Sequence, residues 1–176
     1  VIGVALGTVL LPELSQALAA GEEKKAAHAF NRATEIGLLL TLPCLVMFLV
    51  APDVIMRGLF ARGAFDVQAA EAAAAVLMAY AVGLPAFVLL RTVTPLFHAR
   101  GDTTTPVIAT GIAIAINLAI KIALVFGLGY GAEGLALGTS AGSWVNFGVL
   151  AAVAAGRGLL NVDARLTGMT PRMVFA

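Results

Sequence analysis

Apolar residues in this chain are gathered into long runs separated by short polar segments. A helix needs roughly 20 apolar residues to cross the hydrocarbon core of a bilayer, and most of these runs reach that length. The pattern predicts about five membrane spans, at residues 1–18, 34–51, 69–99, 106–128 and 133–155, with a further span starting near residue 171. The expected fold class is therefore all-α, a polytopic bundle of transmembrane helices.

The polar segments between the runs predict turns and short helices at the membrane surface. Residues 20–32 are polar and helix-prone, so we expect a solvated extension between two spans. Residues 53–65 are too charged to span and predict an interfacial turn with a short helix, followed by Asp66 as a candidate N-cap. Gly83-Leu84-Pro85 predicts a bend within one span, because proline lacks the N–H of a helical hydrogen bond.

Composition agrees with a membrane protein. The chain is 60% hydrophobic and has a mean hydropathy of +0.98, and 12% of its residues are charged, about half the share in a soluble domain. The net charge is +1 and no basic tract is interleaved with aromatic residues, so we expect no nucleic-acid partner. Because Val1 already lies within an apolar helical pattern, we expect all 176 residues to be a fragment of one transmembrane domain.

Lysine and arginine are distributed unequally between the two sets of loops. If the spans alternate in direction, residues 20–32, 100–105 and 156–172 lie on one side of the membrane. That side carries seven basic residues: Lys24, Lys25, Arg32, Arg100, Arg157, Arg165 and Arg172. The opposite side carries two, Arg57 and Arg62. Short loops rich in lysine and arginine face the cytoplasm, so the first set is predicted to be cytoplasmic.

Three polar side chains inside the spans are candidates for function. Asn117 and Lys121 are four residues apart and share one helix face. A lysine at the centre of a membrane helix costs at least about 2.5–3.5 kcal/mol on insertion scales, so such a residue usually faces protein or a wet cavity. Arg91 lies within another span and is a candidate for a substrate cavity.

The span at 133–155 is predicted to pack closely against the one before it. Gly134, Gly138 and Gly142 repeat every four residues, a spacing that lets helix backbones approach each other. Folding the two helices about the glycines at 129–131 places Lys121 opposite 138–139 and Asn117 opposite 142–143. Polar residues then meet across the two helices, and they predict an internal polar or cation site formed by Asn117, Lys121, Thr139 and Ser143.

One hypothesis for this site is that the Lys121 ammonium acts as a tethered cation. It would occupy a place where a transporter could otherwise bind a free cation, and it would tie the two helices into one rigid unit. Its predicted acceptors are the Asn117 side-chain oxygen, the Thr139 hydroxyl and the carbonyls near Gly138.

Several motifs resemble the MurJ/MviN family of lipid II flippases, within the multidrug/oligosaccharidyl-lipid/polysaccharide exporter superfamily. In chain order they are GVALGTVLLPELS, LFARGAF, YAVGLPAF, FHARGDTTTP and GLALGTSAGSWVN. The resemblance implies a fourteen-span transporter of two lobes around a cavity, of which this chain covers the end of the eighth span to the start of the thirteenth. It also implies that the cationic residues holding the substrate pyrophosphate lie mostly before Val1.

The function implied by the resemblance is flipping of lipid II, an undecaprenyl-pyrophosphate-linked cell-wall precursor, across the bacterial inner membrane by alternating access. The implied partners are that precursor, membrane lipids and the cell-wall synthesis machinery. Because flipping breaks no bond, no catalytic residue, metal or cofactor is expected.

Other functions remain open from the sequence. A drug or small-molecule antiporter of the same superfamily is the main alternative. An enzyme acting on lipid-linked intermediates would need clustered acidic or histidine residues at a membrane face, which the sequence does not show. A passive structural subunit would have no reason to keep Arg91 and Lys121 within its spans.

Overall fold

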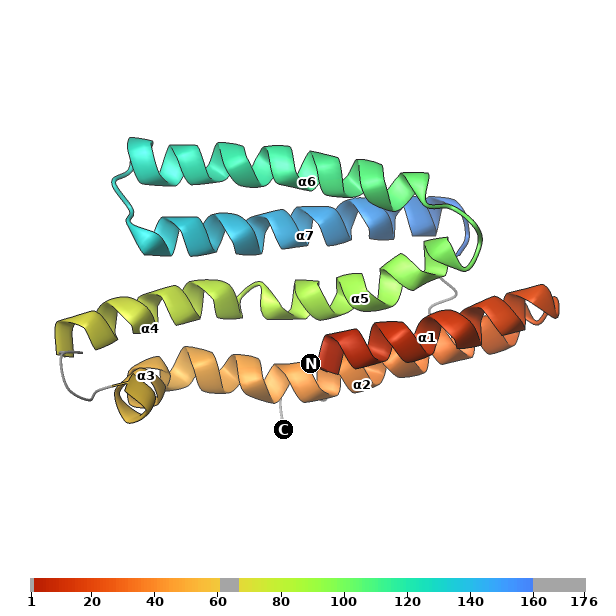
Figure 1. Cartoon of the computed structure of the whole chain (residues 1–176), viewed down its shortest axis with the longest axis horizontal. Coiled ribbons are helices and arrows are strands. Elements are labelled where there is room, and N and C mark those ends of the chain that lie inside the picture. The colour runs from red at the N-terminus through yellow and green to blue at the C-terminus, as the bar shows by residue number, and fades with distance from the viewer. Residues whose placement is uncertain (1, 61–66, 160–176) are drawn as a thin grey trace.

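The computed structural model describes residues 2–60 and 67–159, which form helices joined by short turns (Figure 1). In chain order the elements are α1 (Ile2–Ala19), α2 (Glu23–Val50), α3 (Pro52–Phe60), α4 (Val67–Ala81), α5 (Leu84–His98), α6 (Thr104–Ile122), a π-helix η1 (Ala123–Gly127) and α7 (Ala132–Gly156). These residues contain no strand, which confirms the all-α prediction.

Four stretches of the described chain are long and apolar enough to cross a membrane. They are Glu23–Val50, Gln68–His98, Thr104–Gly127 and Ala132–Gly156. These stretches correspond to four of the expected spans, and α1, at the position of the remaining one, is not among them. Large apolar side chains such as Ile108 and Leu118 on α6 are exposed, as expected for helices that face lipid.

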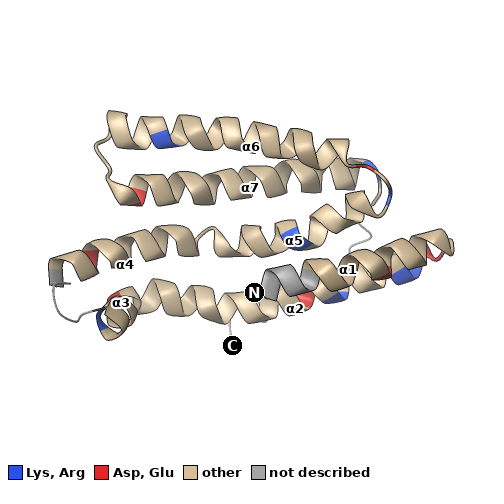
Figure 2. Ribbon diagram, in the orientation of Figure 1, with Lys and Arg blue, Asp and Glu red and all other residues tan. Residues whose placement is uncertain are grey.

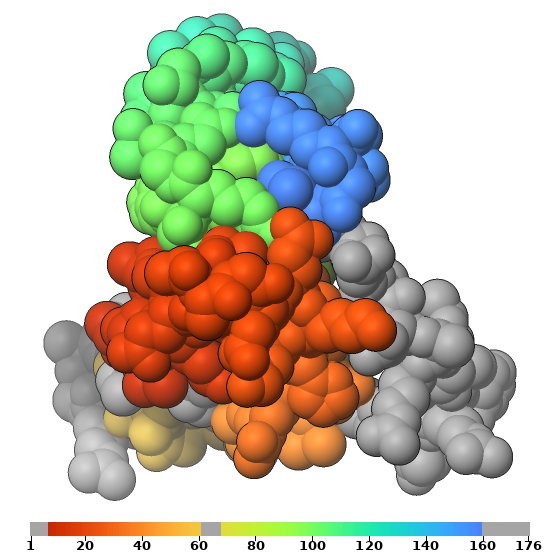
Figure 3. All heavy atoms as spheres, turned by 90° about the vertical axis from the view of Figure 1, so that its right-hand side faces the viewer, coloured from red at the N-terminus to blue at the C-terminus, as the bar shows by residue number. Residues whose placement is uncertain are grey.

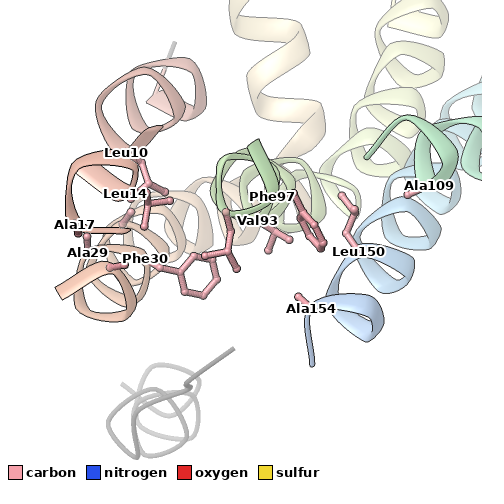
Figure 4. Packing of buried hydrophobic residues seen from close by; sticks show 13 residues of the cluster. Leu10, Leu14, Ala17, Ala29, Phe30, Val93, Phe97, Ala109, Leu150 and Ala154 are labelled. Carbon is pink, nitrogen blue, oxygen red and sulfur yellow. The ribbon is translucent and has the colours of Figure 1, made fainter. Parts of the chain in front are cut away.

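The extension expected at residues 20–32 is helical from Glu23 onward, but one face of it is buried instead of solvated. Helix α2 begins at Glu23 and continues without a break into the membrane stretch. Ala26, Ala29 and Phe30 are buried, because their spacing places them on one apolar face that packs beside α1 and α5 (Figure 4). The exposed side keeps its polar residues, including a Lys25–Glu22 ion pair of 2.8 Å.

The largest buried cluster lies at one end of the bundle and is centred on α5. Figure 4 shows Val93 and Phe97 of α5 between the side chains of α1 and α2 and those of α7. The other large members are Leu10, Leu14, Phe30, Leu96 and Leu150. Helix α5 therefore connects the α1–α2 pair to the α6–α7 pair.

The bend predicted at Gly83-Leu84-Pro85 is confirmed. Helix α4 ends at Ala81 and α5 begins at Leu84, with Pro85 in its first turn. The Gly83 N–H donates to the carbonyl of Tyr80, three residues back, at 3.0 Å. The regular ladder of hydrogen bonds four residues apart is therefore interrupted here.

Polar turns gather at the two ends of the bundle. The α1–α2 turn, the α5–α6 loop and the end of α7 lie at one end, where most charged residues also lie (Figures 1 and 2). The α6–α7 turn, α3 and the start of α4 lie at the other end. Helix α3 is the short helix expected after residue 53, whereas Asp66, Arg62, Arg165 and Arg172 lie outside the described residues.

Candidate functional site

Helices α6 and α7 form an antiparallel hairpin whose turn is made by glycine. Gly129 has φ +71°, a left-handed conformation that glycine adopts without a steric penalty. The π-helix η1 widens the end of α6, and the Tyr130 N–H closes the turn on the carbonyl of Leu124 at 3.0 Å. This turn fixes the register in which the two helices face each other.

The register confirms the pairing predicted from the sequence. A β-carbon added to Gly138 would lie 2.5 Å from Lys121 Cγ, and one added to Gly142 would lie 2.8 Å from Asn117 Cβ. Both glycines are therefore in direct contact with the two polar residues of α6. We call this contact line, formed by Asn117, Lys121, Gly138 and Gly142, the α6–α7 seam.

The hydroxyl groups beside the seam bind their own helix. Thr139 Oγ1 donates to the carbonyl of Leu135 at 3.0 Å, and Ser143 Oγ donates to the carbonyl of Thr139 at 2.9 Å. Threonine and serine commonly satisfy themselves in this way within helices. Within residues 2–60 and 67–159, the side chains of Asn117 and Lys121 make no hydrogen bond or ion pair. The acceptors expected for the Lys121 ammonium are therefore not engaged by it in this part of the chain.

Arg91 lies apart from the seam. It is on α5, its side chain is exposed, and it makes no hydrogen bond or ion pair within the described residues. Isolated basic positions on α5 and α6 are visible in Figure 2, well separated along the bundle. The backbone of Arg91 is closely approached by α1, because a β-carbon on Gly7 would lie 3.5 Å from the Arg91 carbonyl oxygen.

Comparison with known proteins identifies the family. The profile described as "Lipid II flippase MurJ" matches residues 1–169. The chain belongs to the MurJ family. The "Probable lipid II flippase MurJ" of Rhizobium meliloti (strain 1021) is 41% identical over 176 residues, covering 100% of this chain and 32% of the relative. That of Rickettsia prowazekii (strain Madrid E) is 35% identical over 164 residues, covering 93% and 32%.

A solved structure of MurJ has the same helix arrangement. The "Lipid II flippase MurJ, inward closed conformation" superposes with a TM-score of 0.76 at 28% identity, covering 88% of this chain and 32% of that one. This chain thus spans about a third of the length of the MurJ proteins it matches. The family and the four apolar stretches together identify a multi-pass membrane protein.

The motif FHARGDTTTP forms the α5–α6 loop of this MurJ-family chain, and the structure shows contacts of its Asp102 that the sequence did not reveal. Gly101 takes a left-handed turn with φ +75°. Asp102 then accepts hydrogen bonds from the Thr105 N–H at 2.9 Å and the Thr105 hydroxyl at 2.6 Å, so its carboxylate caps the start of α6. The Arg157 guanidinium at the end of α7 also binds Asp102. The loop and the end of α7 lie side by side in Figure 3.

The same contacts set the charge of Asp102. The hydrogen bonds from the Thr105 hydroxyl and N–H, followed by the one from Arg157, hold the pKa of the Asp102 carboxyl well below its usual range. Asp102 is therefore ionised at every physiological pH. It ties the start of α6 to the end of α7 at the opposite end of the hairpin from the glycine turn.

Proposed function

We propose that this chain is part of a transporter that flips lipid II, the lipid-linked peptidoglycan precursor, across the bacterial inner membrane by alternating access. The observation that carries the proposal is the match of residues 1–169 to the MurJ family. The activity belongs to the complete protein, because the chain spans about a third of the relatives' length. We picture the complete protein as fourteen spans in two lobes, with this chain as one fragment of its transmembrane domain.

In this proposal the protein moves its substrate without making or breaking a covalent bond. The substrate is the undecaprenyl-pyrophosphate-linked precursor, membrane lipids surround the apolar helices, and the cell-wall synthesis machinery uses the flipped precursor. Exposed apolar residues on α6 and the first half of α7 suit a lipid boundary.

Arg91 is proposed as a residue of the substrate cavity. Its side chain is exposed within the described chain, and its backbone is held in the bundle core by neighbours such as Val93. A guanidinium group binds phosphate oxygens through two parallel N–H donors. An exposed arginine on a well-packed helix therefore suits recognition of a pyrophosphate group.

The residues Asn117, Lys121, Thr139 and Ser143 are proposed as an internal polar site in which Lys121 supplies a fixed positive charge. The support is the contact of Lys121 and Asn117 with α7 at Gly138 and Gly142. The aliphatic stem of Lys121 packs along this seam, and this contact restricts the positions that its ammonium group can take.

The test is rescue of bacteria depleted of their own lipid II flippase. The complete gene product, expressed at normal membrane levels, is expected to restore growth and cell shape. Absence of rescue, accompanied by resistance to cationic drugs, would support the antiporter of the same superfamily instead.

A further inference from the structure

The bend between α4 and α5 leaves backbone carbonyls without their usual donors. Because Gly83 donates to Tyr80, the carbonyl of Ala79 loses the N–H four residues ahead of it. Pro85 has no N–H to offer to Ala81. In the hydrocarbon core there is no water to satisfy such groups, so they need partners within the protein.

Two side chains of α7 supply donors to the bend. Ser140 Oγ donates to the carbonyl of Ala79 at 2.6 Å, and Trp144 Nε1 donates to the carbonyl of Val82 at 2.9 Å. Ser140 and Trp144 are four residues apart, so they lie on one face of α7. The two bonds join residues that are 61 and 62 positions apart in the chain.

The bend and α7 are also in close steric contact. A β-carbon on Gly83 would lie 2.7 Å from Ser140 Oγ and 3.0 Å from Ser140 Cα. The indole of Trp144 is oriented by an edge-to-face contact with Phe147, with ring centroids 6.1 Å apart. Both donors are therefore held in place from more than one side.

We propose that Ser140 and Trp144 form a clamp that fixes the angle between α4 and α5 and makes the bend move together with α7. Helix α7 also packs against α6 through Gly138 and Gly142, which are not residues of the clamp. The bend, α6 and α7 then form one unit. Each clamp bond restrains the angle of the bend, so the loss of one bond loosens the bend and the loss of both loosens it most.

The experiment is a pulsed electron paramagnetic resonance measurement on the complete protein in lipid nanodiscs, with all native cysteines replaced. Spin labels at Gln68 on α4 and His98 on α5, both exposed, report the angle of the bend. The unmodified background should give one narrow distance distribution. Ser140→Ala and Trp144→Phe should each broaden it, and the double variant should broaden it most.

The matched control is Thr34→Ala, which removes a buried hydroxyl that donates to the Phe30 carbonyl of its own helix at 2.9 Å. It should leave the distribution unchanged. Gly83→Ala, which forces the bend away from Ser140, should shift the mean distance and provides a second route if the double variant does not fold. Identical distributions for Ser140→Ala, Trp144→Phe, Gly83→Ala and the background would overturn the clamp. The distances do not depend on which substrate is carried, so this result is separate from the proposed transport.

Discussion

Lys121 packs its side-chain stem against Gly138, and a β-carbon at Gly138 would lie 2.5 Å from Lys121 Cγ. The close approach exists because glycine leaves the space that any other residue would fill. It also means that a charged residue in a membrane helix is held along its stem by a neighbouring backbone. The contact links the packing of the hairpin to the position of its positive charge.

The glycines of the seam are expected to tolerate no side chain. Gly142→Ala should destabilise more than Gly138→Ala, because the obstacle at Gly142 is Asn117 Cβ, 2.8 Å away and rigidly attached to its backbone. Overpacking of this kind costs roughly 1–3 kcal/mol. Thermal unfolding of the purified complete protein measures the loss.

Gly148→Ala is the matched control on the same helix, since a β-carbon there meets no atom within 4 Å. Its melting temperature should stay the same or rise. Equal melting temperatures for Gly142→Ala and Gly148→Ala would contradict the close packing of the seam.

Two substitutions of Lys121 test the role of its aliphatic stem and the role of its charge separately. Lys121→Met keeps the aliphatic contact with Gly138 and strands no hydrogen bond within the described residues, so thermal stability should be retained. Lys121→Ala removes the stem and should lower the melting temperature. Both variants should lose transport if the fixed charge serves the polar site.

Sodium provides a further readout for the tethered-cation hypothesis. A Lys121→Met protein that loses stability and regains part of it in sodium would show that the ammonium is hydrogen-bonded in the complete protein. That result would contradict the view that the stem alone holds the residue.

Asp102 should give a pH-dependent stability with a definite sign. Its pKa is lowered in the folded protein, so the carboxylate contributes fully to stability above its ordinary pKa of 3.8, and this contribution decreases progressively as the pH falls from that value toward the lower pKa of the folded state. The Asp102→Asn protein should therefore have a lower melting temperature than the unmodified protein, and the difference should be constant from pH 5 to 8. We call this difference in melting temperature the margin.

The margin should narrow below about pH 4, because Asp102 of the unfolded chain then takes up a proton while Asp102 of the folded protein stays ionised, and this favours unfolding. Arg157→Gln should show part of the same loss, because it removes one of the donors to this carboxylate. A margin that is the same at pH 3 and pH 7 would show that ionisation of Asp102 does not contribute to stability.

Arg91 is expected to matter for transport and not for folding. Arg91→Ala should reduce rescue of flippase-depleted cells while leaving the melting temperature nearly unchanged, because the side chain is exposed. Arg91→Lys should recover only part of the activity, since lysine cannot bind phosphate through two parallel donors.

Arg57→Ala is the control, because Arg57 forms an exposed ion pair with Glu71 at 3.1 Å, and such pairs contribute little. Full activity of both Arg91 variants would reduce Arg91 to a membrane anchor.

The sequence predicted the features that depend on local chemistry and regular spacing. The apolar runs, the proline-linked bend and the four-residue glycine repeat are all properties of neighbouring residues. The glycine turn was enough to place Lys121 opposite Gly138, because two helices joined by a short turn have a fixed register.

Contacts between distant segments could not be predicted in the same way. The burial of Phe30 depends on where α1 and α5 lie, which no local pattern specifies. The bond from Ser140 to Ala79 exists only because the bend frees a carbonyl beside α7. The sequence placed Asp102 in a loop, but it could not predict the ion pair of Asp102 with Arg157, which is far away in the chain.

The most direct test of the proposed function is transport by the purified complete protein in lipid vesicles. A lipid-linked precursor carrying a reducible fluorescent label is placed in both leaflets, and an impermeant reductant is added outside. Flipping predicts that the inner-leaflet signal decays with time, and that an excess of unlabelled precursor slows the decay, whereas an ordinary phospholipid does not. An inner-leaflet signal that decays no faster than in protein-free vesicles, while the same vesicles exchange a cationic drug, would contradict the flippase.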